Sequence, residues 1–246
     1  CPDKIQDENS TSGSFVLRIR YIRRPHAGLS GKVYLLDLDN TLHLASSHIL
    51  PEINRQMTRY LETHLELDTQ KASELRTQYW LRYGATLLGM MRHHQTDPHH
   101  FLANTHVFPE LKMLSSRHGS VPHRLRGLNG VRIMLTNAPR AYAVALCKEL
   151  GLYRHLHAVV AIEDMVVHQA WRPKPAGILW PNLKSKLKGR KALLVDDTLG
   201  HLKQASRHGI QTSWITFPGL GFKPLGLTGR VKHRIRQFEA IRTAKF

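Results

Sequence analysis

Cysteine is scarce in this 246-residue chain, which contains only Cys1 and Cys147. The two lie far apart in the sequence, and Cys147 falls in an apolar stretch with helical spacing, so a buried thiol is favoured over a disulfide. This usage excludes a disulfide-rich secreted domain and indicates a reducing, cytoplasmic compartment. Because the first residue is Cys1 rather than Met, the sequence is compatible with a fragment of a longer protein.

Long hydrophobic runs are missing as well. No stretch of about 18 apolar residues occurs, which is the length that a membrane-spanning helix needs. The polar start, CPDKIQDENSTSGS, has no apolar segment of the kind found in signal peptides. We therefore expect a soluble protein without membrane association, and the sequence leaves the oligomeric state open.

Acidic residues are few, and their scarcity sets the charge of the molecule. The 18 Asp and Glu residues stand against 36 Lys and Arg residues, which gives a formal net charge of +18. Such a surplus attracts polyanions. A basic nucleic-acid-binding protein is therefore an alternative, although the basic residues are spread along the chain and no nucleic-acid motif stands out.

Short apolar runs rich in β-branched residues recur along the middle of the chain. They read VYLL, VRIML, AVVAI, KALLV and TSWI, and helix-length segments separate them. This texture is typical of a parallel sheet that is buried on both faces. We predict an α/β fold with a Rossmann-like parallel sheet and helices on both faces.

The spacing of these runs predicts the domain organisation. About 90 residues separate the first run from the second, far more than one crossover helix requires. We predict a catalytic core over residues 31–50 and 119–225, with a helical cap inserted over 51–118. Residues 1–30 are predicted to be a basic, flexible arm with little core, and residues 226–246 a basic C-terminal helix or tail.

Polar residues stand where the predicted strands end. VYLL runs into Asp37, VRIML into Thr136, and KALLV into Asp196 and Asp197. Ligands of open α/β sheets bind outside the carboxyl ends of the strands, so these side chains are expected to meet in one place. A carboxylate beside a divalent cation can attack phosphorus, and a second one two residues later, Asp39, can serve as general acid and base. The alternative is that this pair of Asp residues only caps a turn or a helix.

Four segments together carry a resemblance to a known family. DLDNTL at residues 37–42 resembles the first motif of the haloacid dehalogenase (HAD) superfamily, DxDxT followed by an apolar residue. LTNAP at 135–139, RPKP at 172–175 and LLVDDTLGHLKQA at 193–205 resemble the second, third and fourth motifs, in the same order. The conjunction spans residues 33 to about 215 and is far more specific than any single motif.

The resemblance implies a Mg²⁺-dependent phosphomonoesterase that hydrolyses a small phosphate ester through an aspartyl phosphate. Asp37 would be the nucleophile and Asp39 the general acid and base, while Thr136, Asn137 and Lys174 would bind the phosphoryl group. The implied metal ligands are Asp37 and Asp196, the backbone carbonyl of Asp39, and Asp197 as a ligand or as support for one. Because a halide leaves without a proton, Asp39 argues against haloacid dehalogenation.

A second resemblance concerns the substrate. The run YGATLLGM from Tyr83, followed by His94 and by Asp97-Pro98, is similar to a pattern in the cap of pyrimidine 5′-nucleotidases of this superfamily. It implies a preference for pyrimidine nucleoside 5′-monophosphates. Tyr83 and His94 would contact base and ribose. Asn40 and His43 would lie near the site entrance, where Asn40 would bind the substrate or its phosphate. The remaining residues of the implied wall are Tyr79, Leu87 and Met90.

Other interpretations stay open at this stage. Leu87 and Met90 have the spacing of an ordinary helical core, and a single histidine such as His94 is more often structural than functional. The enzyme could equally be a phosphatase for sugar phosphates or phosphoglycolate. One departure from the family pattern is His201, which stands where related enzymes often carry Asn and puts the strength of metal binding in question.

Overall fold

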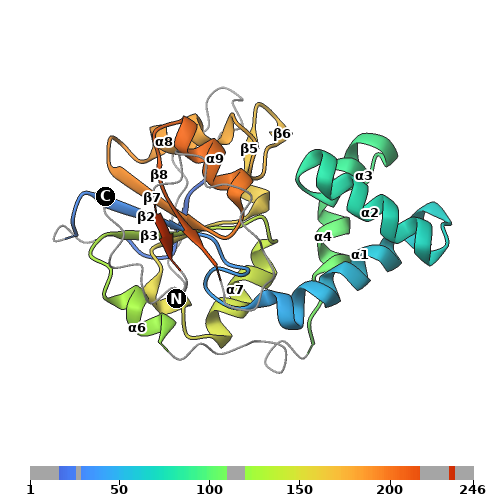
Figure 1. The fold of residues 1–246 in the computed structure, drawn as a ribbon, viewed down its shortest axis with the longest axis horizontal. Coiled ribbons are helices and arrows are strands. Elements are labelled where there is room, and N and C mark those ends of the chain that lie inside the picture. The colour runs from blue at the N-terminus through green and yellow to red at the C-terminus, as the bar shows by residue number, and fades with distance from the viewer. Residues whose placement is uncertain (1–16, 26–28, 110–119, 217–232, 236–246) are drawn as a thin grey trace, which may run out of the picture.

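The computed structural model describes residues 17–25, 29–109, 120–216 and 233–235. Within these ranges the core is a seven-stranded sheet with the strand order β1-β4-β3-β2-β7-β8-β9. Neighbouring strands from β4 to β9 run parallel, and only β1 is antiparallel to its neighbour. The predicted α/β fold with a mostly parallel sheet flanked by helices is confirmed (Figure 1).

The central parallel strands coincide with the five apolar runs of the sequence. They are β2 (Lys32–Leu36), β3 (Val131–Leu135), β4 (Ala158–Val160), β7 (Lys191–Asp196) and β8 (Gln211–Ile215). Strand β2 lies in the middle and pairs with β3 on one side and β7 on the other. The chain order therefore reverses direction across the sheet at β2, which is the switch point where such sheets bind ligands.

Side chains of β2 alternate between two hydrophobic clusters, one on each face of the sheet. Tyr34 and Leu36 join the first cluster, whereas Val33 and Leu35 join the second. Helices α6 (Val121–Arg126) and α7 (Arg140–Glu149) cover the first face, and α8 (Leu179–Lys186) and α9 (Leu199–Arg207) cover the second (Figure 1). Burial on both faces explains why these runs are apolar without alternation.

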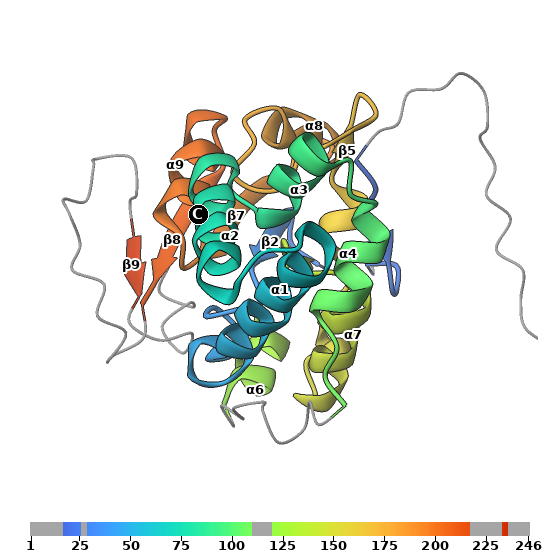
Figure 2. The same cartoon turned by 90° about the vertical axis from the view of Figure 1, so that its right-hand side faces the viewer.

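Four helices between β2 and β3 form a separate body beside the core, which we call the helical cap (Figures 1 and 2). They are α1 (Ile49–Leu65), α2 (Thr69–Tyr83), α3 (Thr86–His94) and α4 (Pro98–Thr105). A third hydrophobic cluster, which includes Leu61, Tyr79 and Phe101, holds them together. The predicted cap over 51–118 ends among residues 110–119, which lie outside the described ranges. No helix in the described ranges is long and apolar enough to cross a membrane.

Helix starts in the cap follow from the sequence. Asp68 precedes α2 and accepts a hydrogen bond from the backbone N–H of Lys71 at 2.9 Å. Asp97 precedes α4 and accepts from the N–H of His99, also at 2.9 Å, with Pro98 in the first turn. Both are the N-cap arrangement that Asp favours, and Pro is tolerated at the first helical position. The Asp-Pro pair of the cap resemblance thus has a structural role here.

The cap contacts the core near the segment that follows strand β6 (Ala170–Trp171). The ring of His99 packs edge-on against Trp171 at a centroid distance of 5.6 Å. Gly84, at the end of α2, has a φ of +83°, and a Cβ atom built on it would lie 3.0 Å from the Cδ atom of Pro175. Glycine is therefore favoured at position 84 for two reasons, the left-handed backbone conformation and this tight approach to Pro175.

The prediction of a flexible arm with little core is wrong for residues 17–25. Leu17 is 1% exposed in the second cluster, and β1 (Arg20–Tyr21) pairs with β4. The Nε atom of Arg20 donates to the buried Asp164 at 2.8 Å. A buried carboxylate needs a partner, so a basic side chain that looks solvated in the sequence is held against the core instead. Residues 1–16 and 26–28 lie outside the described ranges.

The C-terminal prediction also differs from the structure in part. Within the segment expected to be a basic helix or tail, β9 (His233–Ile235) is a strand that pairs parallel to β8. An unpaired edge of a parallel sheet offers a row of backbone donors and acceptors, and a short segment can satisfy them whatever its helical pattern. The other residues of 226–246, and residues 217–225 of the predicted core, lie outside the described ranges.

The burial of Leu17 can be tested against a matched substitution. Leu17→Ala is expected to lower the free energy of unfolding by about 2–5 kcal/mol, because the change leaves a cavity in the second cluster. Leu81→Ala in α2, where the side chain is 71% exposed, is expected to have little effect. Urea denaturation of both variants measures the difference, and equal stabilities would contradict the packing of residues 17–25 on the core.

Candidate active site

The carboxyl ends of three neighbouring strands bring the sequence-predicted polar residues together. Asp37 follows β2 directly, and its backbone N–H donates to the carbonyl of Val195 at 3.0 Å. Asp196 ends β7, and Thr136 follows β3. Asp37 and Thr136 are 7% and 1% exposed. The three side chains thus lie at one edge of the sheet, beside the switch point.

The buried side chain of Lys174 forms ion pairs with two of these carboxylates. Its Nζ atom lies 2.8 Å from Oδ1 of Asp37 and 2.7 Å from Oδ2 of Asp196, and the side chain is fully buried. Burial alone would lower the pKa of Lys174, but the charges of Asp196 and Asp37 raise it above its ordinary value. The ammonium is therefore charged at neutral pH and holds both carboxylates in place.

The backbone of Lys174 is itself held by Asn137. The amide Nδ2 of Asn137 donates to the carbonyl of Lys174 at 2.8 Å, and its Oδ1 accepts from the N–H of Lys174 at 3.0 Å. These two bonds connect the end of β3 to the segment after the β5–β6 hairpin (Val166–Val167 and Ala170–Trp171). We expected Asn137 to bind phosphate, whereas in the structure its amide group fixes the position of Lys174.

Three carboxylates form a cluster that fits a divalent cation. Oxygen atoms of Asp37, Asp196 and Asp197 all lie within 4.8 Å of one another. Three carboxylates against the single ammonium of Lys174 leave a surplus of negative charge. Mg²⁺ prefers hard oxygen ligands and is usually bound through one or two carboxylates with water completing the octahedron. The cluster therefore fits the predicted cation, and these three residues are the side chains that would hold it.

Burial and the neighbouring charges together shift the pKa values within the cluster. Burial, with the charge of Asp196, raises the pKa of Asp37 to about 6 against the opposing effect of Lys174. Burial, with the charges of Asp37 and Asp196, raises the pKa of Asp197 to about 8. Burial also disfavours the charge on Asp196, but His201 and Lys174 outweigh it and lower its pKa far below the ordinary value. A bound cation would relieve the repulsion between these carboxylates.

Asp39 lies outside the carboxylate cluster and has its own partners. Its Oδ1 atom accepts from the Nε2 atom of His43 at 2.9 Å and from the hydroxyl of Tyr142 at 2.7 Å. Burial alone would raise the pKa of Asp39, but the hydrogen bonds from His43 and Tyr142 bring it below its ordinary value. His43 was expected near the site entrance; it is 1% exposed and lies behind Asp39 instead.

Two predicted binding residues near the strand ends have structural partners. Asn40, with a φ of +55°, accepts from the backbone N–H and the hydroxyl of Ser46 at 3.0 and 2.9 Å, which stabilises the loop after β2. Asn tolerates this left-handed conformation better than most residues. Thr136 accepts from the N–H of Ala138 at 3.0 Å through its Oγ1. Contact of Asn40 or Thr136 with phosphate stays a prediction.

The polar residues predicted in the cap have hydrogen-bond partners within the cap. The hydroxyl of Tyr83 lies 2.6 Å from Nε2 of His93, and the hydroxyl of Tyr79 lies 2.8 Å from Nε2 of His94. Leu87 and Met90 are buried in the third cluster, as the ordinary core interpretation had it. A substrate contact through Tyr83 or His94 would have to share or replace these hydrogen bonds.

Two residues at the site, Thr41 and Tyr142, were not assigned to it from the sequence, and a third, His201, was noted there as a departure from the family pattern that affects metal binding. Thr41 donates its hydroxyl to Oδ2 of Asp37 at 3.2 Å, and its position four residues after Asp37 was the available signal. His201 places Nδ1 2.9 and 3.1 Å from the two oxygens of Asp196. Tyr142 has no local signal, because it reaches Asp39 from a helix 103 residues away.

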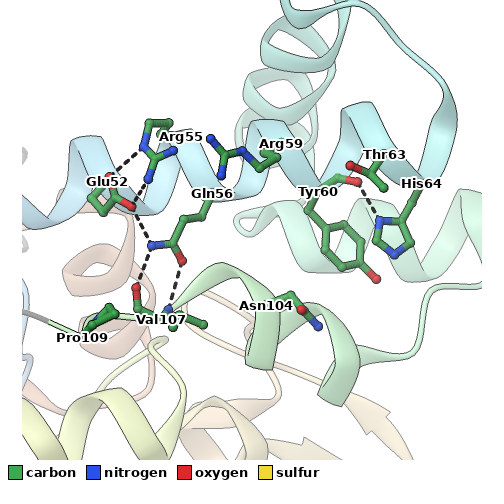
Figure 3. A pocket seen from close by; sticks show the side chains of 10 residues that line it. All are labelled: Glu52, Arg55, Gln56, Arg59, Tyr60, Thr63, His64, Asn104, Val107 and Pro109. Carbon is green, nitrogen blue, oxygen red and sulfur yellow. Dashed lines mark hydrogen bonds and ion pairs between the residues drawn. The ribbon is translucent and has the colours of Figure 1, made fainter.

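A pocket of about 460 Å³ lies elsewhere, between α1 and α4 of the cap (Figure 3). Gln56 bridges it by donating to Glu52 and to the carbonyl of Val107, each at 2.7 Å. Arg55 on its rim is paired with the same Glu52. None of the strand-end carboxylates lines this pocket, so it is separate from the candidate active site.

The chain was compared with known families and solved structures. A model of the haloacid dehalogenase-like hydrolase family matches residues 32–209. The HAD-hydrolase YfnB from Bacillus subtilis, solved bound to magnesium, is similar with a TM-score of 0.55 and 12% identity over 86% of this chain and 97% of that one. A predicted phosphoglycolate phosphatase from Haemophilus somnus gives 0.55 and 16% over 86% and 96%. A dehalogenase gives 0.53 and 16% over 89% and 98%.

The carboxylate cluster predicts a thermal response to Mg²⁺. A cation that binds only the folded state stabilises it by about 2.7 kcal/mol at a hundred times its Kd. Mg²⁺ is therefore expected to raise the Tm. Asp197→Asn keeps the size of the side chain but can never carry the negative charge, so it is expected to weaken this rise. Differential scanning fluorimetry with Mg²⁺ or EDTA measures it. Asp68→Asn, at the N-cap of α2, is the control; an unchanged response in Asp197→Asn would contradict the assignment.

Proposed function

This chain belongs to the family of haloacid dehalogenase-like hydrolases, and we propose that it is a Mg²⁺-dependent phosphomonoesterase that acts through an aspartyl phosphate on Asp37. The observation that carries the proposal is the arrangement around Asp37, whose carboxylate is held by Lys174 and Thr41 beside Asp196 and Asp197. Asp39, two residues along the same loop, supplies the second carboxyl group that transfer from an alkoxide requires.

In the first proposed step Asp37 attacks phosphorus in line with the bond to the leaving oxygen. That bond breaks, and the leaving oxygen takes a proton from Asp39. Lys174 and Thr136 stabilise the charge on the equatorial phosphoryl oxygens. Mg²⁺, when bound by the carboxylate cluster, would neutralise further charge on those oxygens and lessen the repulsion between two anions. The products are an alcohol and an aspartyl phosphate, a mixed anhydride, on Asp37.

In the second step Asp39 takes a proton from water while the water oxygen attacks the same phosphorus. The bond between phosphorus and Asp37 breaks, which releases inorganic phosphate and restores the carboxylate of Asp37. Asp39 then returns to its ionised state by passing the proton to the departing phosphate. Because the pKa of Asp39 is below its ordinary value, this side chain is ionised in the free protein at neutral pH. The proton for the first step then enters with the substrate, since a phosphate monoester has a second pKa of about 6.

For the substrate we propose nucleoside 5′-monophosphates, with pyrimidine bases preferred. Support comes from the resemblance of the cap sequence from Tyr83 to Pro98 to that of pyrimidine 5′-nucleotidases. Gly84 of this motif lies against Pro175, next to Lys174, so the motif is close to the catalytic lysine. Sugar phosphates or phosphoglycolate are the alternative substrates, and the similar structure from Haemophilus somnus carries a phosphoglycolate phosphatase name.

Two other functions are less well supported. One similar structure is a dehalogenase. A halide leaves without a proton, however, so a dehalogenase would have no use for Asp39 as a general acid. Nucleic-acid binding, which the net charge of +18 left open, gains no support from the family match.

Substitution of the nucleophile tests the mechanism. Asp37→Asn is expected to lower kcat on any phosphate ester more than about a thousandfold, because the amide cannot attack phosphorus. Asp68→Asn serves again as the matched control, with the fold of both checked by circular dichroism. Peptide mass spectrometry after an acid quench should find phosphate on Asp37 in the wild type. An Asp37→Asn variant with full activity would refute the proposal.

Phosphate release from a substrate panel tests the specificity. With Mg²⁺ we expect UMP, CMP and dTMP to give a higher kcat/KM than AMP, phosphoglycolate or sugar phosphates, and EDTA to abolish all of it. A preference for another ester would retain the phosphatase and remove the nucleotidase assignment. Failure of every ester with folded, Mg²⁺-loaded protein would remove both.

A further inference from the structure

We propose that Tyr142 and His43 are positioning residues that fix one carboxylate oxygen of Asp39 and so present the other oxygen to the leaving group of the substrate. The inference rests on the proposed function, because it assigns a task within general acid and base catalysis. It concerns Tyr142, which the sequence analysis did not place in the site, and His43, which that analysis placed near the site entrance without a role in catalysis.

Both donors reach the same oxygen atom. Tyr142 donates to Oδ1 of Asp39 at 2.7 Å, and His43 lies 2.9 Å from that same atom. The Oδ2 atom accepts no hydrogen bond from any residue in the described ranges, although one fifth of the Asp39 side chain is exposed. Rotation about the Cβ–Cγ bond of Asp39 would exchange its two carboxylate oxygens, and two donors on one oxygen oppose this rotation. Oδ2 is thereby kept free for proton transfer.

The two donors come from different parts of the fold. His43 lies in the loop after β2, where Asp39 and His43 also form an isolated backbone bridge. The Nδ1 atom of His43 is buried and has no hydrogen-bond partner among the described residues. An N–H group there would be an unsatisfied buried donor, which is costly, so the proton belongs on Nε2, the atom that faces Asp39.

Tyr142 is held rigidly on α7. Its side chain is 3% exposed, and the rings of His106 and Phe108 pack on it at centroid distances of 5.9 and 5.2 Å. Burial and the nearby charge of Asp39 raise the pKa of Tyr142 well above its ordinary value, so the hydroxyl stays a donor across the neutral range. His106 and Phe108 follow α4, and they therefore connect the end of the cap to the residue that orients Asp39.

A positioning role has a signature that a merely structural role lacks. An alkoxide is a poor leaving group and needs the proton of Asp39, whereas p-nitrophenolate leaves without one. Loss of the orientation of Asp39 therefore slows hydrolysis of an alkyl phosphate far more than that of p-nitrophenyl phosphate. A variant that only loosens the fold, or weakens binding of the phosphoryl group, slows both esters alike.

The first experiment compares Tyr142→Phe with the wild type on a simple alkyl phosphate and on p-nitrophenyl phosphate, with saturating Mg²⁺. We expect kcat/KM to fall about tenfold or more on the alkyl ester, since one hydrogen bond to a charged group is lost, and less than about threefold on the nitrophenyl ester. Tyr21→Phe, at a side chain 50% exposed, is the matched control and is expected to change neither.

A second pair of variants secures the result if Tyr142→Phe folds poorly. Gln at position 43 can place an N–H near the position of the histidine Nε2 atom, whereas Met cannot. His43→Gln is expected to retain most of the alkyl phosphatase activity, and His43→Met to show the same selective loss as Tyr142→Phe. In an Asp39→Ala background neither substitution should add further dependence on the leaving group, because the residue they orient is gone.

The outcomes separate the two proposals. If the wild type hydrolyses both esters but the Tyr142 and His43 variants lose activity on both equally, the positioning role is overturned and the phosphatase assignment survives. If the wild type with Mg²⁺ hydrolyses neither these esters nor the nucleotides, the proposed function fails and the positioning role fails with it. Selective loss on the alkyl ester alone supports both.

Discussion

The buried ammonium of Lys174 is the interaction on which the rest of the site depends. An isolated charge in the interior would cost several kcal/mol, and only close carboxylates with good geometry offset that cost. Asp37 and Asp196 supply them at 2.8 and 2.7 Å. Because the two carboxylates end neighbouring strands, the pairing requires β2 and β7 to be in register and requires the segment after β6 to reach the sheet. Asn137 fixes that segment by both polar atoms of its amide.

The same balance of charge explains the division of labour among four aspartates. Asp37, Asp196 and Asp197 crowd together with one lysine, so their environment favours a further cation over three independent anions. Asp39 is turned away from them toward neutral hydrogen-bond donors, which leaves it able to exchange a proton. Two roles for one side-chain type thus follow from which neighbours each carboxylate meets, in the way that paired catalytic carboxylates are generally distinguished.

Much of this could be predicted from the sequence, and the remainder has physical reasons for being hidden. Strands buried on both faces leave a plain apolar signal, and Asp37, Thr136 and Asp196 stand visibly at their ends. Leu17 was misjudged because the basic residues around it mask a strand whose cation pairs with a buried carboxylate. The partnership of Tyr142 with Asp39 could not be predicted, since no local spacing links residues 103 positions apart. The structural partners of Asn137 and Asn40 were equally hidden, because a polar residue next to a motif can hydrogen-bond the backbone whether or not it also contacts a ligand.

Gly84 has a consequence for how this protein can vary. Because Gly84 has no Cβ atom, Pro175 can lie close to its backbone. The absence of a side chain at this position thus sets how closely the cap approaches the core here. Mutations elsewhere on the outer surfaces of the cap can accumulate without reaching the lysine. A change at this one position pushes on Pro175 and hence on Lys174. The outer surfaces of the cap can therefore change in sequence while the cap keeps its contact with the core at Pro175, as long as Gly84 is retained.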